Sequence, residues 1–219
     1  MDHKRITVFV GHYGSGKTNI AINYAKTLKN AGHDVVIADL DIVNPYFRTK
    51  DSELELRENG IELICSVYAN TNIDIPALPS DLYSVTENRN KYAVLDIGGD
   101  DRGALALGRL TPYIIDEDNY EMLLVVNFSR PLTRTVNDVI EVISEIEHAS
   151  GLKVTALVNN TNLGEDTDVN LIKSSHVKIK ELSSITGLPI KFTSVNKNIS
   201  SNDLGIDNIL YMNLQKRIF

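Results

Sequence analysis

The chain has 219 residues, of which 42% are hydrophobic and 23% charged, and its formal net charge is −7. These values fit a globular protein with one sizeable core, so we expect a single domain over residues 1–219. The acidic balance argues against broad electrostatic binding to nucleic acid or anionic membranes, and a lone cysteine, Cys65, excludes an intrachain disulfide.

Strand-like and helix-like segments alternate along the chain, which predicts a three-layer α/β/α domain with a mainly parallel sheet. In chain order, strands are expected at 5–11, 34–40, 61–65, 92–97, 121–128, 153–159 and 189–195. Helices are expected at 17–30, 131–148 and 169–186, with one short helix near 81–87 in the less regular stretch 66–90. The acidic run 116–118 is expected to be a solvated loop, and the tail from 196 has no regular pattern. Because no apolar stretch approaches the ~20 residues of a membrane helix and no signal peptide is evident, we expect a cytoplasmic protein.

The loop after the first predicted strand has the sequence of a phosphate-binding loop. Residues 11–18, Gly-His-Tyr-Gly-Ser-Gly-Lys-Thr, match the Walker A pattern, and they lie between an apolar run and a helical pattern, as the motif requires. Lys17 can reach the β- and γ-phosphates, and the Thr18 hydroxyl is placed to bind Mg²⁺. A Rossmann dinucleotide loop is the alternative, but its third glycine is replaced by Asn19. The predicted phosphate-binding residues are Gly11, Gly14, Ser15, Gly16, Lys17, Thr18 and Asn19.

Two aspartates end the second predicted strand. Asp39 and Asp41 lie two residues apart, so the alternation of a strand places them on one face. Two carboxylates together beside a triphosphate suggest Mg²⁺ coordination and orientation of an attacking water. The alternative is that Asp41 caps a helix that begins near Asn44.

The fourth predicted strand ends in Asp96, which is typical of a Walker B strand whose carboxylate belongs to the Mg²⁺ shell. Gly98 and Gly99 follow it and give the form Asp-x-x-Gly of a switch loop, in which a glycine N–H contacts the γ-phosphate. A simple turn after a strand is the alternative interpretation.

The sixth predicted strand ends in Asn159 and Asn160, either of which is placed to hydrogen-bond a base edge, although asparagines also form turns readily. The guanine-binding pattern Asn-Lys-x-Asp is absent, since Asn stands at both 160 and 162. Without that carboxylate, ATP is favoured over GTP.

These motifs, in this order and spacing, resemble the MinD/ParA group of P-loop ATPases, which also includes the nitrogenase iron protein and nucleotide-binding domains of cobalamin synthesis. The resemblance covers about residues 5–195, and the segment 34–48 resembles a bacterial subgroup with a general ATP-binding description. It implies a P-loop NTPase architecture with a sheet of seven or eight strands. It also implies that Lys17 and Thr18 serve the phosphates and Mg²⁺, that Asp39 and Asp96 surround the metal, that Asp41 orients water, and that Asn159 touches adenine.

Many members of this group form ATP-bridged dimers, in which an early lysine of the loop reaches the phosphates of the partner. The matching position here is His12, which is not a fixed positive charge near neutral pH. This departure argues against an ATP-bridged, nucleotide-dependent homodimer. The expected function is an Mg²⁺-dependent, slow ATPase that acts as a nucleotide switch for an unknown protein partner. The alternatives are an ATP-dependent kinase or ligase of the dethiobiotin-synthetase type and an adaptor that binds nucleotide without hydrolysing it.

Overall fold

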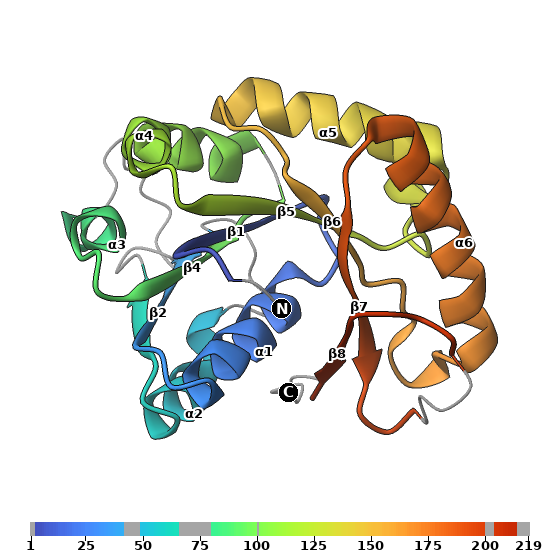
Figure 1. Ribbon diagram of the computed structural model, residues 1–219, viewed down its shortest axis with the longest axis horizontal. Coiled ribbons are helices and arrows are strands. Elements are labelled where there is room, and N and C mark those ends of the chain that lie inside the picture. The colour runs from blue at the N-terminus through green and yellow to red at the C-terminus, as the bar shows by residue number, and fades with distance from the viewer. Residues whose placement is uncertain (1–2, 42–48, 66–79, 100, 200–203, 214–219) are drawn as a thin grey trace.

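The computed structural model describes residues 3–41, 49–65, 80–99, 101–199 and 204–213. They form one parallel sheet with the strand order β3-β2-β4-β1-β5-β6-β7-β8, and helices cover both of its faces (Figure 1). This arrangement confirms the predicted α/β fold. The strands are β1 (Ile6–Val10), β2 (Val35–Leu40), β3 (Glu62–Cys65), β4 (Tyr92–Ile97), β5 (Tyr120–Val126), β6 (Ala156–Asn159), β7 (Ile190–Asn196) and β8 (Ile209–Met212).

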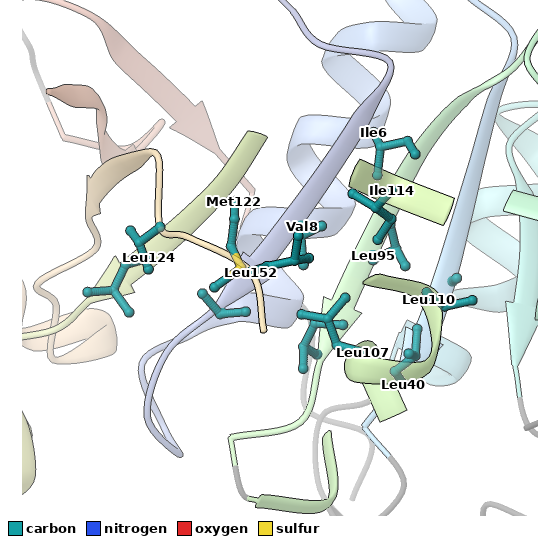
Figure 2. Packing of buried hydrophobic residues seen from close by; sticks show 14 of the residues in the cluster. Ile6, Val8, Leu40, Leu95, Leu107, Leu110, Ile114, Met122, Leu124 and Leu152 are labelled. Atoms are coloured by element: carbon teal, nitrogen blue, oxygen red, sulfur yellow. The ribbon is translucent and has the colours of Figure 1, made fainter. Parts of the chain in front are cut away.

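The central strands are buried on both faces, which explains their nearly continuous apolar sequences. One face packs against α1 (Lys17–Asn30) and α2 (Glu53–Glu58). The other face packs against α3 (Ser84–Glu87), α4 (Asp101–Glu117), α5 (Val136–Ser150) and α6 (Val169–Thr186). On that second face, Leu107, Leu110 and Ile114 of α4 belong to the same buried cluster as Val8 and Leu95 (Figure 2).

Capping groups set the ends of two long helices. The predicted helix 131–148 is wrong at its start, because Thr135 and Asp138 form a capping box that begins α5 at Val136, and only a short 3-10 helix, Pro131–Thr133, precedes it. The predicted helix 169–186 is confirmed: the Asp168 side chain accepts from the Leu171 N–H at 2.7 Å, and Gly187 ends α6 in a left-handed conformation.

The sequence analysis missed α2, α4 and β8. Helix α4 contains Gly103, Gly108 and Pro112, which obscure its helical pattern. The prediction of a solvated loop at 116–118 is wrong for Glu117, which ends α4 and forms a buried ion pair with Arg5, whereas Asp116 and Asp118 are exposed. Among the described residues, no helix combines the length and apolar character needed to span a membrane.

Candidate functional site

The predicted phosphate-binding loop lies between β1 and α1, in the strand–loop–helix arrangement that its motif requires. Gly16 precedes the helix with φ 90°, a left-handed conformation that favours glycine. A Cβ atom at Gly16 would lie 2.3 Å from Nδ2 of Asn160, so this position also has no room for a side chain. The loop conformation therefore depends on the glycine that the motif specifies.

Lys17 and Ser15 both bond back to the start of the loop. The Lys17 Nζ atom donates to the His12 carbonyl oxygen at 3.1 Å, and the Ser15 N–H donates to the same oxygen at 3.2 Å. Lys17 and Thr18, the first residues of α1, are largely buried. The buried Ser15 hydroxyl has no hydrogen-bond partner among the described residues. An ammonium group and two hydroxyls thus gather at the N-terminus of α1, where the helix dipole also favours an anion.

Asp96 is the buried carboxylate beside this loop. It lies at the end of β4, level with Phe9 on β1 and with Asp39 on β2. Its Oδ2 atom accepts from the Thr49 hydroxyl at 2.9 Å, while Oδ1 is buried without a hydrogen-bond partner in the described part of the chain. Thr49 begins a 3-10 helix, Thr49–Ser52, and sequence reasoning did not single it out.

The charges around Asp96 show which predicted residues the fold brings together. Burial raises the pKa of Asp96 to about 6, and the hydroxyls of Thr18 and Thr49 and the Lys17 ammonium act in the opposite direction. The Asp41 carboxylate raises this pKa further. Lys17, Thr18, Asp41 and Asp96 therefore converge, although they come from three separate segments of the sequence.

These residues fit a magnesium ion. Hydroxyl and carboxylate oxygens are the ligands that Mg²⁺ prefers, and the unpartnered Oδ1 atom of Asp96 has the chemistry of a ligand to the ion or to one of its waters. The described residues hold no cluster of three or more His, Cys, Asp or Glu side chains that would form a metal cage. That finding is compatible with Mg²⁺, which usually uses one or two protein ligands together with phosphates and waters.

Asp39 helps to shape the turn that presents Asp41. Its Oδ1 atom accepts from the Asp41 N–H at 2.9 Å, a local bond that holds the backbone just after β2. Asp39 therefore positions Asp41, whatever its contribution to the metal shell. The alternative role of Asp41, as the cap of a helix near Asn44, falls on residues 42–48, which are outside the described residues.

The segment after β4 touches the phosphate-binding loop directly. A Cβ atom at Gly99 would lie 2.6 Å from the Tyr13 backbone nitrogen and 3.0 Å from the His12 carbonyl carbon. This close approach requires glycine and joins the predicted switch segment, Gly98 and Gly99, to the predicted phosphate-binding segment.

The two asparagines at the end of β6, Asn159 and Asn160, make contacts other than the predicted contact with a base. Asn159 is fully buried: its Nδ2 donates to Ser175 Oγ at 2.9 Å, and its Oδ1 accepts from the Thr161 N–H and hydroxyl. The prediction that Asn159 contacts the base is therefore not supported, because its amide joins β6 to α6. Asn160 instead donates to the Ser15 carbonyl oxygen at 2.6 Å. The alternation of side chains along a strand was a signal for this difference, since it turns neighbouring residues to opposite faces.

The raised pKa of Asp96 predicts a pH-dependent cost to stability. Its folded pKa of about 6 lies above the ordinary value of 3.8, so the folded chain binds more protons than the unfolded chain between these values. The free energy of unfolding should fall as pH rises through this window and stay lower above it. Without metal and nucleotide, Asp96→Asn should be more stable than the parent at pH 8 by roughly 1–3 kcal/mol, and by much less at pH 4.5.

Urea unfolding of both proteins at several pH values measures this difference. Asp34→Asn, which changes an exposed aspartate, is the matched control and should show no comparable change with pH. A gap between Asp96→Asn and the parent that does not widen from pH 4.5 to pH 8 would contradict the assigned pKa direction.

Solved structures with the same fold include FtsY proteins and a protein of the signal recognition particle. The chain is similar to the cell division protein FtsY of Thermotoga maritima, with a TM-score of 0.63, 18% identity, and coverage of 88% of this chain and 62% of that one. The fold is that of the P-loop NTPases. FtsY of Elizabethkingia anophelis in complex with GDP matches with a TM-score of 0.54, 17% identity, and coverage of 90% and 58%. The 54 kDa signal recognition particle protein of Aeropyrum pernix K1, also in complex with GDP, matches with a TM-score of 0.56, 16% identity, and coverage of 88% and 41%.

These likenesses establish the fold alone, because all three identities are below 20%. The chain spans about three-fifths of the length of the two FtsY structures that it matches. No protein-family model and no curated protein matches the sequence. The resemblance to the MinD/ParA group therefore stays a prediction within the wider P-loop fold.

Proposed function

We propose that this chain binds ATP with Mg²⁺, hydrolyses it slowly, and acts as a nucleotide switch for a protein partner. The observation that carries the proposal is the buried Asp96 Oδ1 atom, which has no partner among the described residues and lies in the group formed by Thr18, Lys17 and Asp41. Buried polar atoms are normally hydrogen-bonded, and an orphan among phosphate-loop residues is well explained by a ligand.

Each residue has a role in this proposal. The backbone amides of the loop and the Lys17 ammonium would neutralise the phosphates, while Thr18 and Asp96 would hold the metal. At such a site Mg²⁺ supplies charge neutralisation on the phosphoryl oxygens. Asp41, fixed by its backbone bond to Asp39, would orient the attacking water. Positioning and electrostatic stabilisation of this kind are the main means of catalysing phosphoryl transfer.

The choice of ATP over GTP rests on the segment that follows β6. Residues 156–163 contain no Asp or Glu, so this segment has no carboxylate to accept hydrogen bonds from guanine. Two of the structural neighbours were solved with GDP, which makes GTP the ligand to compare directly with ATP.

The switch in this proposal is the contact between Gly99 and the backbone of His12 and Tyr13. A γ-phosphate held by the loop would also hold this glycine segment, and hydrolysis would release it. A partner that recognises one state would then be controlled by the nucleotide. A homodimer bridged by ATP would need a cationic group other than His12. Measuring the mass in solution with ADP and with a non-hydrolysable ATP analogue shows whether such a dimer forms.

Asp41→Asn tests the catalytic part of the proposal. This substitution should leave the affinity for Mg²⁺-ATP within a few fold and lower the rate of phosphate release about a hundredfold, because it removes the carboxylate that orients water. Single-turnover hydrolysis and calorimetric binding measure the two quantities separately. Asp34→Asn is the control and should change neither. Unchanged turnover in Asp41→Asn would remove Asp41 from the mechanism, and the absence of any binding heat with the parent protein would overturn the proposed function.

A further inference from the structure

Arg130 contacts the phosphate-binding loop, although it lies outside the sequence motifs, in the turn that follows β5. It follows β5, and its Nε atom donates to the Gly14 carbonyl oxygen at 2.9 Å. Its Nε and Cζ atoms would lie 3.5 and 3.8 Å from a Cβ atom at Gly14, so the guanidinium is in van der Waals reach of this position of the loop. The side chain is exposed, and no carboxylate among the described residues forms an ion pair with it.

The backbone around Arg130 is firmly held. The Arg130 N–H donates to the Asn127 carbonyl oxygen at 3.0 Å, and the Arg130 carbonyl oxygen accepts from the Thr133 N–H at 3.2 Å. The Thr133 hydroxyl donates to the same Asn127 oxygen at 2.6 Å. A hydrogen-bonded turn thus presents an exposed arginine to the loop, and the position of that arginine does not depend on a mobile connection.

The sheet order indicates which end of a nucleotide lies near Arg130. Strand β1 lies between β4 and β5, and two residues fitted for Mg²⁺ and the attacking water, Asp96 on β4 and Asp41 after β2, are on the β4 side. Arg130 follows β5 and Asn160 follows β6, both on the opposite side of the loop. The nucleoside, rather than the terminal phosphates, therefore belongs on the side of Arg130.

The asparagine side chains on the Arg130 side of the loop are used in hydrogen bonds within the protein. Asn127 donates to the Asn162 carbonyl oxygen at 3.3 Å, and Asn162 donates to the Asn160 carbonyl oxygen at 2.8 Å. Asn159 and Asn160 are bonded to Ser175 and to the loop, as described above. Amides used in this way are poorly placed to distinguish the hydrogen-bonding edges of adenine and guanine. A planar guanidinium can still bind a purine, because it stacks on the face of any base.

We propose that Arg130 is the base-stacking residue of this site, and that the site consequently takes purine nucleoside triphosphates with little discrimination between adenine and guanine. This inference rests on the proposed function and refines it, because it names the group that holds the base and makes the preference for ATP a modest one.

The test compares ligands with and without a base. Binding of Mg²⁺-ATP, Mg²⁺-GTP and inorganic tripolyphosphate to the full chain is measured by calorimetry for the parent, Arg130→Ala and Arg130→Lys. Stacking predicts that Arg130→Ala weakens ATP and GTP about tenfold and leaves tripolyphosphate unchanged. Arg130→Lys should lose most of the same affinity, because an ammonium keeps the charge but not the plane. Arg134→Ala, which removes a nearby exposed arginine, is the control and should change none of the three.

Three results would overturn the inference. Arg130→Ala could weaken tripolyphosphate as much as ATP, which would place the arginine on the phosphates. It could also leave all three affinities unchanged, or the parent could prefer one purine by more than about a hundredfold, a preference that stacking does not give. Failure of the parent to bind tripolyphosphate and both nucleotides is a different result, because it would overturn the proposed function itself.

Discussion

Replacing Lys17 by alanine is expected to remove detectable binding of Mg²⁺-ATP. Lys17 is the one lysine of the phosphate-binding loop, it is largely buried, and its ammonium lies at the N-terminus of α1 near Asp96. In the proposed complex this ammonium pairs with the nucleotide phosphates. Truncating one partner of a buried charge pair costs about 2–5 kcal/mol, which corresponds to roughly a 30- to 5,000-fold loss of affinity for the nucleotide. The calorimetric signal for the nucleotide should therefore vanish at protein concentrations that saturate the parent chain.

The fold should survive this substitution. The Lys17 Nζ atom donates to the His12 carbonyl oxygen, a bond within the loop, and the side chain does not belong to either of the apolar clusters that pack against the sheet. The thermal midpoint of Lys17→Ala without nucleotide should stay close to that of the parent, while the upward shift that ATP gives the parent should be absent. Lys29→Ala removes a half-exposed lysine at the other end of the same helix and should bind normally. Retention of ATP binding by Lys17→Ala would contradict the assignment of the loop.

Local sequence was sufficient for the features that a few neighbouring residues determine. The phosphate-binding loop could be predicted because eight consecutive residues specify it, and its strand and helix follow directly on either side. Asp96 could be predicted as a site residue because it ends an apolar strand, and the carboxyl ends of parallel strands meet at one edge of the sheet. Helix α6 has the predicted bounds, and in the structure a capping aspartate and a terminal glycine mark its two ends.

Contacts between distant segments could not be predicted in this way. The Asn160–Ser15 bond joins residues 145 positions apart, the Arg130–Gly14 bond spans 116 positions, and the Thr49–Asp96 bond spans 47. Ser15 and Gly14 belong to the phosphate-binding loop and Asp96 ends the Walker B strand, but no motif points to Arg130 or Thr49. The structure therefore adds to the predicted site the contacts of Asn160 and Arg130 with the phosphate-binding loop, and the inference about the base rests on these contacts.

Irregular composition explains the missed elements. Two glycines and a proline lie inside α4, which weakens its helical pattern, yet the helix continues through Pro112 and packs Leu107, Leu110 and Ile114 on the sheet. Strand β8 has four residues and joins the sheet beside β7 only through long-range pairing. A short edge strand after an irregular segment gives little periodic signal, and its position depends on tertiary contacts.

Replacing Arg5 by methionine is expected to produce the largest loss of stability. The Arg5 guanidinium is buried with the Glu117 carboxylate, which it contacts through Nε and Nη2. Nη1 and Nη2 both donate to the Val85 carbonyl oxygen at 3.1 Å, and Nη1 donates to the Lys91 carbonyl oxygen at 2.9 Å. One side chain therefore joins the start of β1 to α3, to the residue before β4, and to the end of α4.

Breaking such a pair leaves Glu117 buried without its counter-charge, and the carbonyl groups of Val85 and Lys91 lose a donor. Removal of one partner of a buried pair costs about 3–5 kcal/mol, so urea unfolding of Arg5→Met should show a midpoint far below that of the parent. Lys153→Ala breaks the surface pair with Glu147 and should cost less than about 1 kcal/mol. If the lone Glu117 charge causes most of the loss, Arg5→Met with Glu117→Gln should be more stable than Arg5→Met alone. A loss of under about 1 kcal/mol in Arg5→Met would show that the pair does not hold these elements together.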